Sequence, residues 1–193
     1  MGCEGQLKES CTDLIALGCD VIGPGFQFGG LQPPYAVMEC IHENAEPPNR
    51  EYFKQKPGLD PRYRSYVIFQ GGKYGLIIKK SEFNEIFAPI ESIDEAISYA
   101  MVMTSLSSRY DIDLKANVDY LVDVIEETHV KETPDGYLVY LFDWDRKMGC
   151  DIHTSYAVKV LVTRDGEVRE VERQEIYREH ACTDFGVLTL DEN

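Results

Sequence analysis

The amino-acid sequence predicts an α+β fold, in which an antiparallel sheet packs with one or two helices. Three observations support this prediction. The last third of the chain alternates apolar and polar residues over runs separated by turn sequences, as antiparallel strands do. A β-hairpin pattern covers residues 63–80, and residues 93–105 place apolar side chains at helical spacing. With 193 residues and 44% hydrophobic content, the chain has enough apolar side chains to form a core.

Residues 1–62 are expected to form a short helix and then an irregular coat over the domain at 63–193. The helix is predicted over residues 5–18, with Gly18 as a left-handed terminator. Most prolines fall in the coat, at Pro24, Pro33, Pro34, Pro47, Pro48 and Pro57. They disfavour long regular elements, although the pattern allows a short strand near residues 35–41. Cys19 and Cys40 are candidates for fastening this long connection.

The hairpin at 63–80 and a short helix follow one another along the chain. YRSYVIFQ and KYGLIIKK are rich in β-forming residues, and Gly71-Gly72 between them tolerates the positive φ of a two-residue turn. Ser81 is the expected N-cap of a helix that carries Phe83 and Phe87 and ends before Pro89.

A second helix is predicted over residues 93–105, because Ser92 and Glu95 have the spacing of a capping box. Residues 113–122 are expected to be helical as well. Four successive antiparallel strands should follow, around the turns at 133–136 and 164–167. The hairpin should join or face this sheet, so that 63–193 forms one domain or two lobes, 63–110 and 111–193.

The order of helix and then antiparallel sheet loosely resembles cystatin-like or NTF2-like folds. This resemblance is architectural, covers less than half of the chain and brings no functional residues with it.

Cys150 and Cys182 flank the last two predicted strands. If the turn at 164–167 contains one bulged residue, the register places these cysteines directly opposite each other. Their α-carbons would then be about 4.5 to 5.5 Å apart, which suits a disulfide. We therefore predict a Cys150–Cys182 disulfide. The alternatives are free buried thiols or a zinc site built from Cys150, His153, His180 and Cys182, which requires His153 to turn to the face of the other three.

The remaining cysteines are unassigned at this level: Cys3, Cys11, Cys19 and Cys40. The even count of six favours an extracellular or cell-envelope location, with the cytoplasm as the alternative. No signal-peptide pattern is visible, so the sequence is read either as cytosolic or as a mature form. Gly2-Cys3 allows a lipid anchor at Cys3, but a lipid there would leave one of the other three N-terminal thiols unpaired.

Charge excludes several partner classes. Nineteen basic against 34 acidic residues give a net charge of −15, which repels nucleic acid and anionic lipid. No apolar run approaches the roughly 20 residues that span a bilayer. Looser calcium binding by Asp143, Asp145 and Asp151 is the remaining cation option. The tyrosines, among them Tyr35, Tyr52, Tyr63, Tyr66 and Tyr74, are candidates for a contact surface for a protein partner. The alternative is that they fill a half-buried sheet.

No catalytic motif accompanies the histidines, including Cys40-Ile-His42 and His129. The sequence therefore predicts a non-catalytic exported or cell-envelope protein, stabilised by disulfides and without a favoured cofactor. It would act as a binding or assembly module for a protein partner or for further copies of itself. The alternative is a metal-binding protein or metal-dependent enzyme that uses the Cys150, His153, His180 and Cys182 cluster.

Overall fold

A computed structural model describes most of the chain. The described residues are 14, 16–23, 28–43, 53, 62–113, 118–145 and 149–183. Side chains are not described at residues 43, 62, 149, 150 and 181–183.

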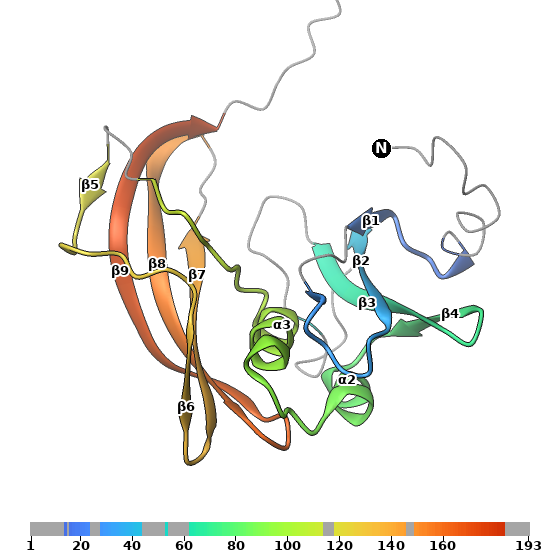
Figure 1. The fold of residues 1–193 in the computed structure, drawn as a ribbon. Helices are drawn as coiled ribbons and strands as arrows, with labels where there is room; N and C mark the ends of the chain where they lie inside the picture. Colours follow the sequence, from blue (N-terminus) through green and yellow to red (C-terminus); the bar gives the residue numbers. More distant parts are fainter. Residues whose placement is uncertain are drawn as a thin grey trace, which may run out of the picture.

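Two antiparallel sheets lie on either side of a pair of helices (Figure 1). The first sheet has the order β1-β2-β3-β4, from β1 (Val21–Gly23), β2 (Ala36–Glu43), β3 (Arg62–Gln70) and β4 (Lys73–Ile77). The second has the order β5-β9-β8-β7-β6, from β5 (Asp119–Tyr120), β6 (Val130–Thr133), β7 (Gly136–Asp145), β8 (Gly149–Thr163) and β9 (Val168–Thr183). The helices are α2 (Lys80–Phe87) and α3 (Ile93–Thr104). The predicted α+β class is confirmed, and the hairpin β3–β4 lies with β1 and β2 in a sheet separate from the C-terminal one.

The hairpin forms as predicted, with positive φ at both Gly71 (59°) and Gly72 (80°). Its strand β3 pairs with β2 from Ala36 opposite Phe69 to Glu43 opposite Arg62. The expected short strand near residues 35–41 is therefore confirmed, whereas β1 was not foreseen. The domain boundary at residue 62 stays a prediction, although β2 and β3 share one sheet.

The two helices begin as their carboxylates dictate. Ser92 Oγ accepts from Glu95 N–H (3.2 Å), and Glu95 Oε2 accepts from Ser92 N–H (2.8 Å), which confirms the capping box. The prediction of Ser81 as the other N-cap is wrong. The N-cap is Lys79, because Glu82 Oε2 accepts hydrogen bonds from the backbone N–H of Ile78 and Lys79 (2.9 and 3.0 Å).

The helix expected over 113–122 is absent from its described part, residues 113 and 118–122. Asp119 and Tyr120 instead form β5 and pair with Arg178 and Tyr177 of β9. Pairing with a strand distant in sequence overrides the local pattern there. The helix expected over 5–18 lies mostly outside the described residues, although Leu14 is helical and Gly18 has the predicted positive φ of 80°.

The four predicted C-terminal strands are confirmed as β6 to β9, and β8 and β9 bow strongly along their length (Figure 1). Cys150 lies directly opposite Cys182, as predicted, but by a different route. The register at the turn differs from the predicted one, since Val162 pairs with Val168 across it and Gly166 has a positive φ of 85°. Two register shifts further along, between Ser155 and Tyr156 and between Lys159 and Val160, bring the cysteines level.

One core joins both sheets through the helices. It includes Tyr66 and Ile68 from β3, Tyr99 from α3, and Val139 and Val160 from the second sheet. A smaller cluster lies on the outer face of the first sheet, where Leu14 and the Cys19–Cys40 disulfide cover Val67. The suggestion that Cys19 and Cys40 fasten the N-terminal connection is confirmed.

Candidate functional site

The segment between α3 and β6 crosses the face of the second sheet that α3 leaves uncovered. Val139 and Leu141 point to α3, and side chains alternate along a strand, so Phe142 and Trp144 point to the opposite face. Ser107 pairs with Phe142 by two backbone hydrogen bonds (3.0 and 2.9 Å), which seals the edge of β7. Beyond Ser107, residues 108–113 run over this second face, and residues 121–129 return from β5 to β6 (Figure 1).

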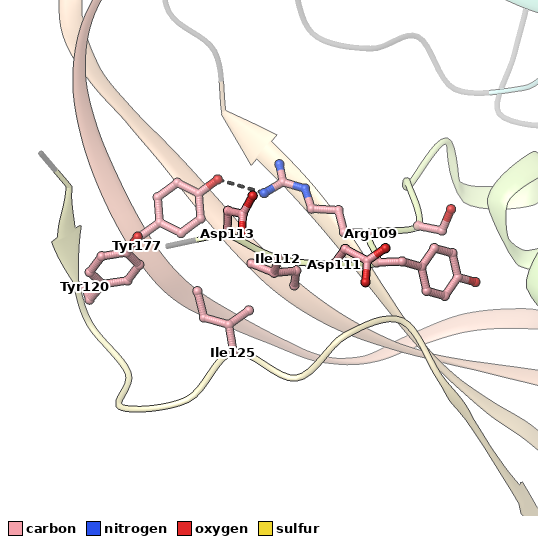
Figure 2. A pocket seen from close by; sticks show the side chains of 9 residues that line it. Arg109, Asp111, Ile112, Asp113, Tyr120, Ile125 and Tyr177 are labelled. Atoms are coloured by element: carbon pink, nitrogen blue, oxygen red, sulfur yellow. Dashed lines mark hydrogen bonds between the residues drawn. The ribbon is translucent and has the colours of Figure 1, made fainter. Parts of the chain in front are cut away.

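A cavity of about 390 Å³ lies between this crossing segment and β9 (Figure 2). It is lined by Ser108, Arg109, Tyr110, Asp111, Ile112, Asp113, Tyr120, Ile125 and Tyr177. This volume falls in the range of sites that hold small molecules. A smaller cavity of about 110 Å³ adjoins it beneath Val122 and Val124, and Ile125 lines both.

Arg109 is the central charged group of the cavity wall. Its Nη1 donates a hydrogen bond to the Tyr177 hydroxyl (2.7 Å), drawn in Figure 2. Its guanidinium also lies over the rings of Phe142, Trp144 and Tyr177, at 5.3, 5.9 and 6.0 Å from their centroids. Three aromatic rings thus hold the half-buried cation by cation–π contacts.

Most of the Arg109 donors are left over. A guanidinium carries five N–H donors, and the Tyr177 hydroxyl uses one of them. Among the residues that the structure describes, no carboxylate lies within ion-pair distance of Arg109. A half-buried cation with spare donors, facing a cavity, is positioned to bind an anionic group of a ligand.

Two carboxylates share the cavity with this cation. Asp111 has a positive φ of 51°, and its N–H donates to Glu127 Oε1 (3.0 Å). Asp113 lines the cavity two residues further on. In the view of Figure 2, Asp111 lies toward one end of the group of side chains, and Tyr120 and Tyr177 lie toward the other. The cavity therefore presents both signs of charge.

Apolar side chains are exposed around the cavity. Tyr110 is 55% exposed and Val124 76%, and Leu121 and Trp144 are exposed as well. Large apolar groups gathered at a concave site are typical of a binding surface.

His42 and Ser65 form the other pair with catalytic side-chain types. His42 Nε2 lies 2.7 Å from Ser65 Oγ and 3.4 Å from Cys40 Sγ. Ser65 is completely buried, and Cys40 is bonded to Cys19, so neither atom is available as a nucleophile. Burial lowers the pKa of His42 below its usual value and keeps it neutral at pH 7. This pair is part of the packing around the Cys19–Cys40 disulfide.

The predicted Cys150–Cys182 site is only partly described. The backbone register brings the two residues together, but their side chains lie outside the described ones, so the disulfide stays a prediction. His180 shares their face and is 70% exposed, 3.9 Å from Asp119. His153 pairs with Glu179 on the opposite face. Within the described side chains, no three metal-binding groups converge.

The other expected site residues are scattered. Asp143 Oδ2 binds Arg173 Nη2 (2.7 Å), so this candidate calcium ligand already has a cationic partner. Tyr66 is wrong as a contact residue, because it is fully buried in the core. Of the other tyrosines, Tyr35 packs on Phe87, Tyr63 stacks on His42, and Tyr74 packs on Phe69. Tyr52, Cys3 and Cys11 lie outside the described residues.

Sequence reasoning missed the cavity, because Arg109 and Tyr177 are 68 positions apart and come from unrelated patterns. The one available signal was Asp111-Ile-Asp113, which does not match a calcium loop.

Comparisons of the chain with protein-family models, curated proteins and solved structures found no match. None of the helices in the described part is both long and apolar enough to cross a membrane.

Proposed function

We propose that this chain is a non-catalytic, exported or cell-envelope binding protein, which holds a small carboxylate-bearing ligand in the cavity at Arg109. One observation carries the proposal: Arg109 is half-buried, surrounded by aromatic rings, and has spare donors facing a cavity of about 390 Å³.

The chemistry of the wall supports binding rather than catalysis. Its nine lining residues include neither histidine, the side chain that most often acts as a general base, nor cysteine, a common nucleophile. The guanidinium presents a planar fork that matches a carboxylate in a two-bond arrangement. The phenols of Tyr110 and Tyr120 add rigid apolar area for the rest of the ligand.

The disulfide supports the proposed location. Cys19–Cys40 covers a buried cluster of the first sheet, and structural disulfides of this kind persist in oxidising compartments. A binding protein outside the cytosol also benefits from a charge of −15, which keeps copies of the chain apart in solution.

The first prediction compares 3-phenylpropionate with its neutral amide, 3-phenylpropionamide. We expect the carboxylate to bind about tenfold more tightly, because a charge-assisted hydrogen bond contributes about 1.5 to 3 kcal/mol. Trp144 is the only tryptophan of the chain and lies 5.9 Å from the Arg109 guanidinium, so its fluorescence should report binding.

Two substitutions make this test specific. Arg109→Gln should abolish the preference for the carboxylate, and Arg109→Lys should weaken it because an ammonium lacks the planar fork. Arg169→Gln, an exposed site on β9 outside the cavity lining, is the matched control. Equal binding of both ligands to the native chain, or an unchanged preference in a folded Arg109→Gln variant, would contradict the proposal.

A further inference from the structure

We infer that the ligand is zwitterionic, of the size of one or two amino acids, with its carboxylate on Arg109 and its ammonium group facing Asp111 and Asp113. This inference rests on the proposed function and specifies the ligand class of the same site.

The cavity brings together charges of both signs. Arg109 supplies one positive charge, and Asp111 and Asp113 supply two negative charges from the next four residues of the chain. In the described part of the chain, neither carboxylate is bonded to a cation. A ligand that carries only a carboxylate would satisfy Arg109 and meet repulsion from both aspartates, whereas an added ammonium group turns that repulsion into attraction.

The electrostatic field of the whole molecule also favours a zwitterion over an anion. With a net charge of −15, the chain repels a free anion on approach. A zwitterion has no net charge and is not repelled. It nevertheless presents a carboxylate to Arg109 once it is inside the cavity.

The backbone at Asp111 has an uncommon conformation, with a positive φ of 51°. A positive φ is uncommon outside glycine, and aspartate is one of the few residues that tolerate it. The hydrogen bond from Asp111 N–H to Glu127 Oε1 ties this conformation to the returning part of the crossing segment. The backbone of Asp111 is thus tied to a residue 16 positions further along the chain. Uncommon backbone conformations of this kind concentrate at binding sites.

The size and apolar surface of the cavity suit a small ligand. A cavity of about 390 Å³ lies near the lower end of small-molecule sites, which suits one or two amino acids rather than a long peptide. Ile125 and the Tyr120 ring line the cavity together with the charged groups. They provide the contact surface for an apolar or aromatic side chain of the ligand.

Four matched ligands test the inference on the full-length chain. They are 3-phenylpropionamide, which is neutral, 3-phenylpropionate, which adds the carboxylate, phenylalaninamide, which carries only the ammonium group, and phenylalanine, which carries both. Affinities are measured by Trp144 fluorescence and by calorimetry. We expect phenylalanine to bind most tightly, about fivefold above 3-phenylpropionate, since ion pairs with exposed carboxylates contribute little each.

Substitutions assign each charge of the ligand to its partner. Asp111→Asn and Asp113→Asn together should remove the advantage of phenylalanine over 3-phenylpropionate and leave the preference for carboxylate over amide. Arg109→Gln should do the reverse. Asp135→Asn, in the exposed turn between β6 and β7, is the control and should change neither ratio. Thermal unfolding of each variant shows that it is folded.

The outcomes separate the two proposals. If 3-phenylpropionate binds better than its amide but phenylalanine binds no better than 3-phenylpropionate, the zwitterion inference is wrong and the proposed function stands. If phenylalaninamide binds as tightly as phenylalanine, the site selects cations and both proposals are wrong. If none of the four ligands binds, the proposed function itself is overturned.

Discussion

Single residues in this protein are placed against their ordinary chemistry at two positions, Arg109 and His42. Arg109 is a half-buried cation whose stabilisation comes from aromatic faces rather than from a carboxylate among the described residues. His42 is a buried base held beside Ser65 and the disulfide. Arg109 is tested through ligand affinity, and His42 is tested through the free energy of unfolding.

The pH dependence of stability is predicted from His42. Burial lowers its pKa below the usual 6.5, although a backbone hydrogen bond with Gly18 and the charge of Asp20 act in the other direction. The unfolded chain therefore takes up this proton at a higher pH than the folded chain. The contribution of the neutral His42 to the free energy of unfolding is therefore fully present above pH 6.5. It is lost as the pH falls from 6.5 through the lower pKa of the folded state.

Urea unfolding between about pH 8 and pH 5 checks this prediction. The native chain should lose more free energy of unfolding on acidification than a His42→Gln variant does. His180→Gln provides the comparison, because His180 is 70% exposed and lies outside the core. Parallel pH profiles for the native chain and His42→Gln would rule out this role for the buried imidazole.

Elements follow local sequence where their own side chains close them and depart from it where a distant strand intervenes. The Ser92 cap of α3 and the Gly71-Gly72 turn involve neighbours in sequence, so both were predictable. The N-cap at Lys79 was not predictable, because lysine is not a typical N-cap residue. The cap comes instead from Glu82 inside α2, whose carboxylate accepts from the Lys79 N–H. β5 was not predictable either, since its reason for being extended is β9, more than 50 residues away.

The candidate site was less predictable than the fold for the same reason. Its wall combines the segment after α3, β5, the returning segment and β9, and only the three-dimensional path brings Arg109 to Tyr177. The register of β8 and β9 shows an intermediate case. The sequence placed Cys150 opposite Cys182 by assuming one bulge at the turn, and the structure reaches the same pairing with two bulges inside the strands.

That register leads to a covalent prediction. Because Cys150 and Cys182 are directly opposite on adjacent strands, their α-carbons lie within the range of a disulfide. Digestion without reducing agent, followed by mass spectrometry, should recover one crosslinked peptide that contains Cys150 and Cys182, and another that contains Cys19 and Cys40. Stoichiometric zinc with Cys150 and Cys182 reduced would instead support the metal alternative with His180.

At the scale of the whole molecule, one core connects both sheets through α2 and α3. The single hydroxyl proton of Tyr99 in α3 is shared between Asn84 Oδ1 of α2 (2.7 Å) and the Gly166 carbonyl in the β8–β9 turn (3.1 Å). The backbone N–H of Ile90 also donates to the carbonyl of Arg164 in that turn (2.8 Å). The long hairpin is thereby fixed to the helices, and loss of either sheet would expose the apolar surface of the other.

The Cys19–Cys40 disulfide adds to this stability from the outside of the first sheet. It closes a loop with a sequence separation of 21 residues, for which the chain-entropy model gives a stabilisation of about 3 kcal/mol. We expect the double variant Cys19→Ala, Cys40→Ala to lose about this amount in urea unfolding and to keep its affinity for 3-phenylpropionate. A loss below about 1 kcal/mol would mean that packing alone holds Leu14, Leu17 and Cys19 on the sheet.

The outer edge of β9 affects how this protein can associate with other polypeptides. Apart from the short β5, the described chain places no strand against that edge. Its residues from Arg169 to Glu175 carry charges of both signs, with Arg173 bound to Glu170 and Asp143. Another polypeptide that added itself there would have to bury this lattice of ions. We therefore expect the charges along this edge to disfavour the addition of further strands to β9.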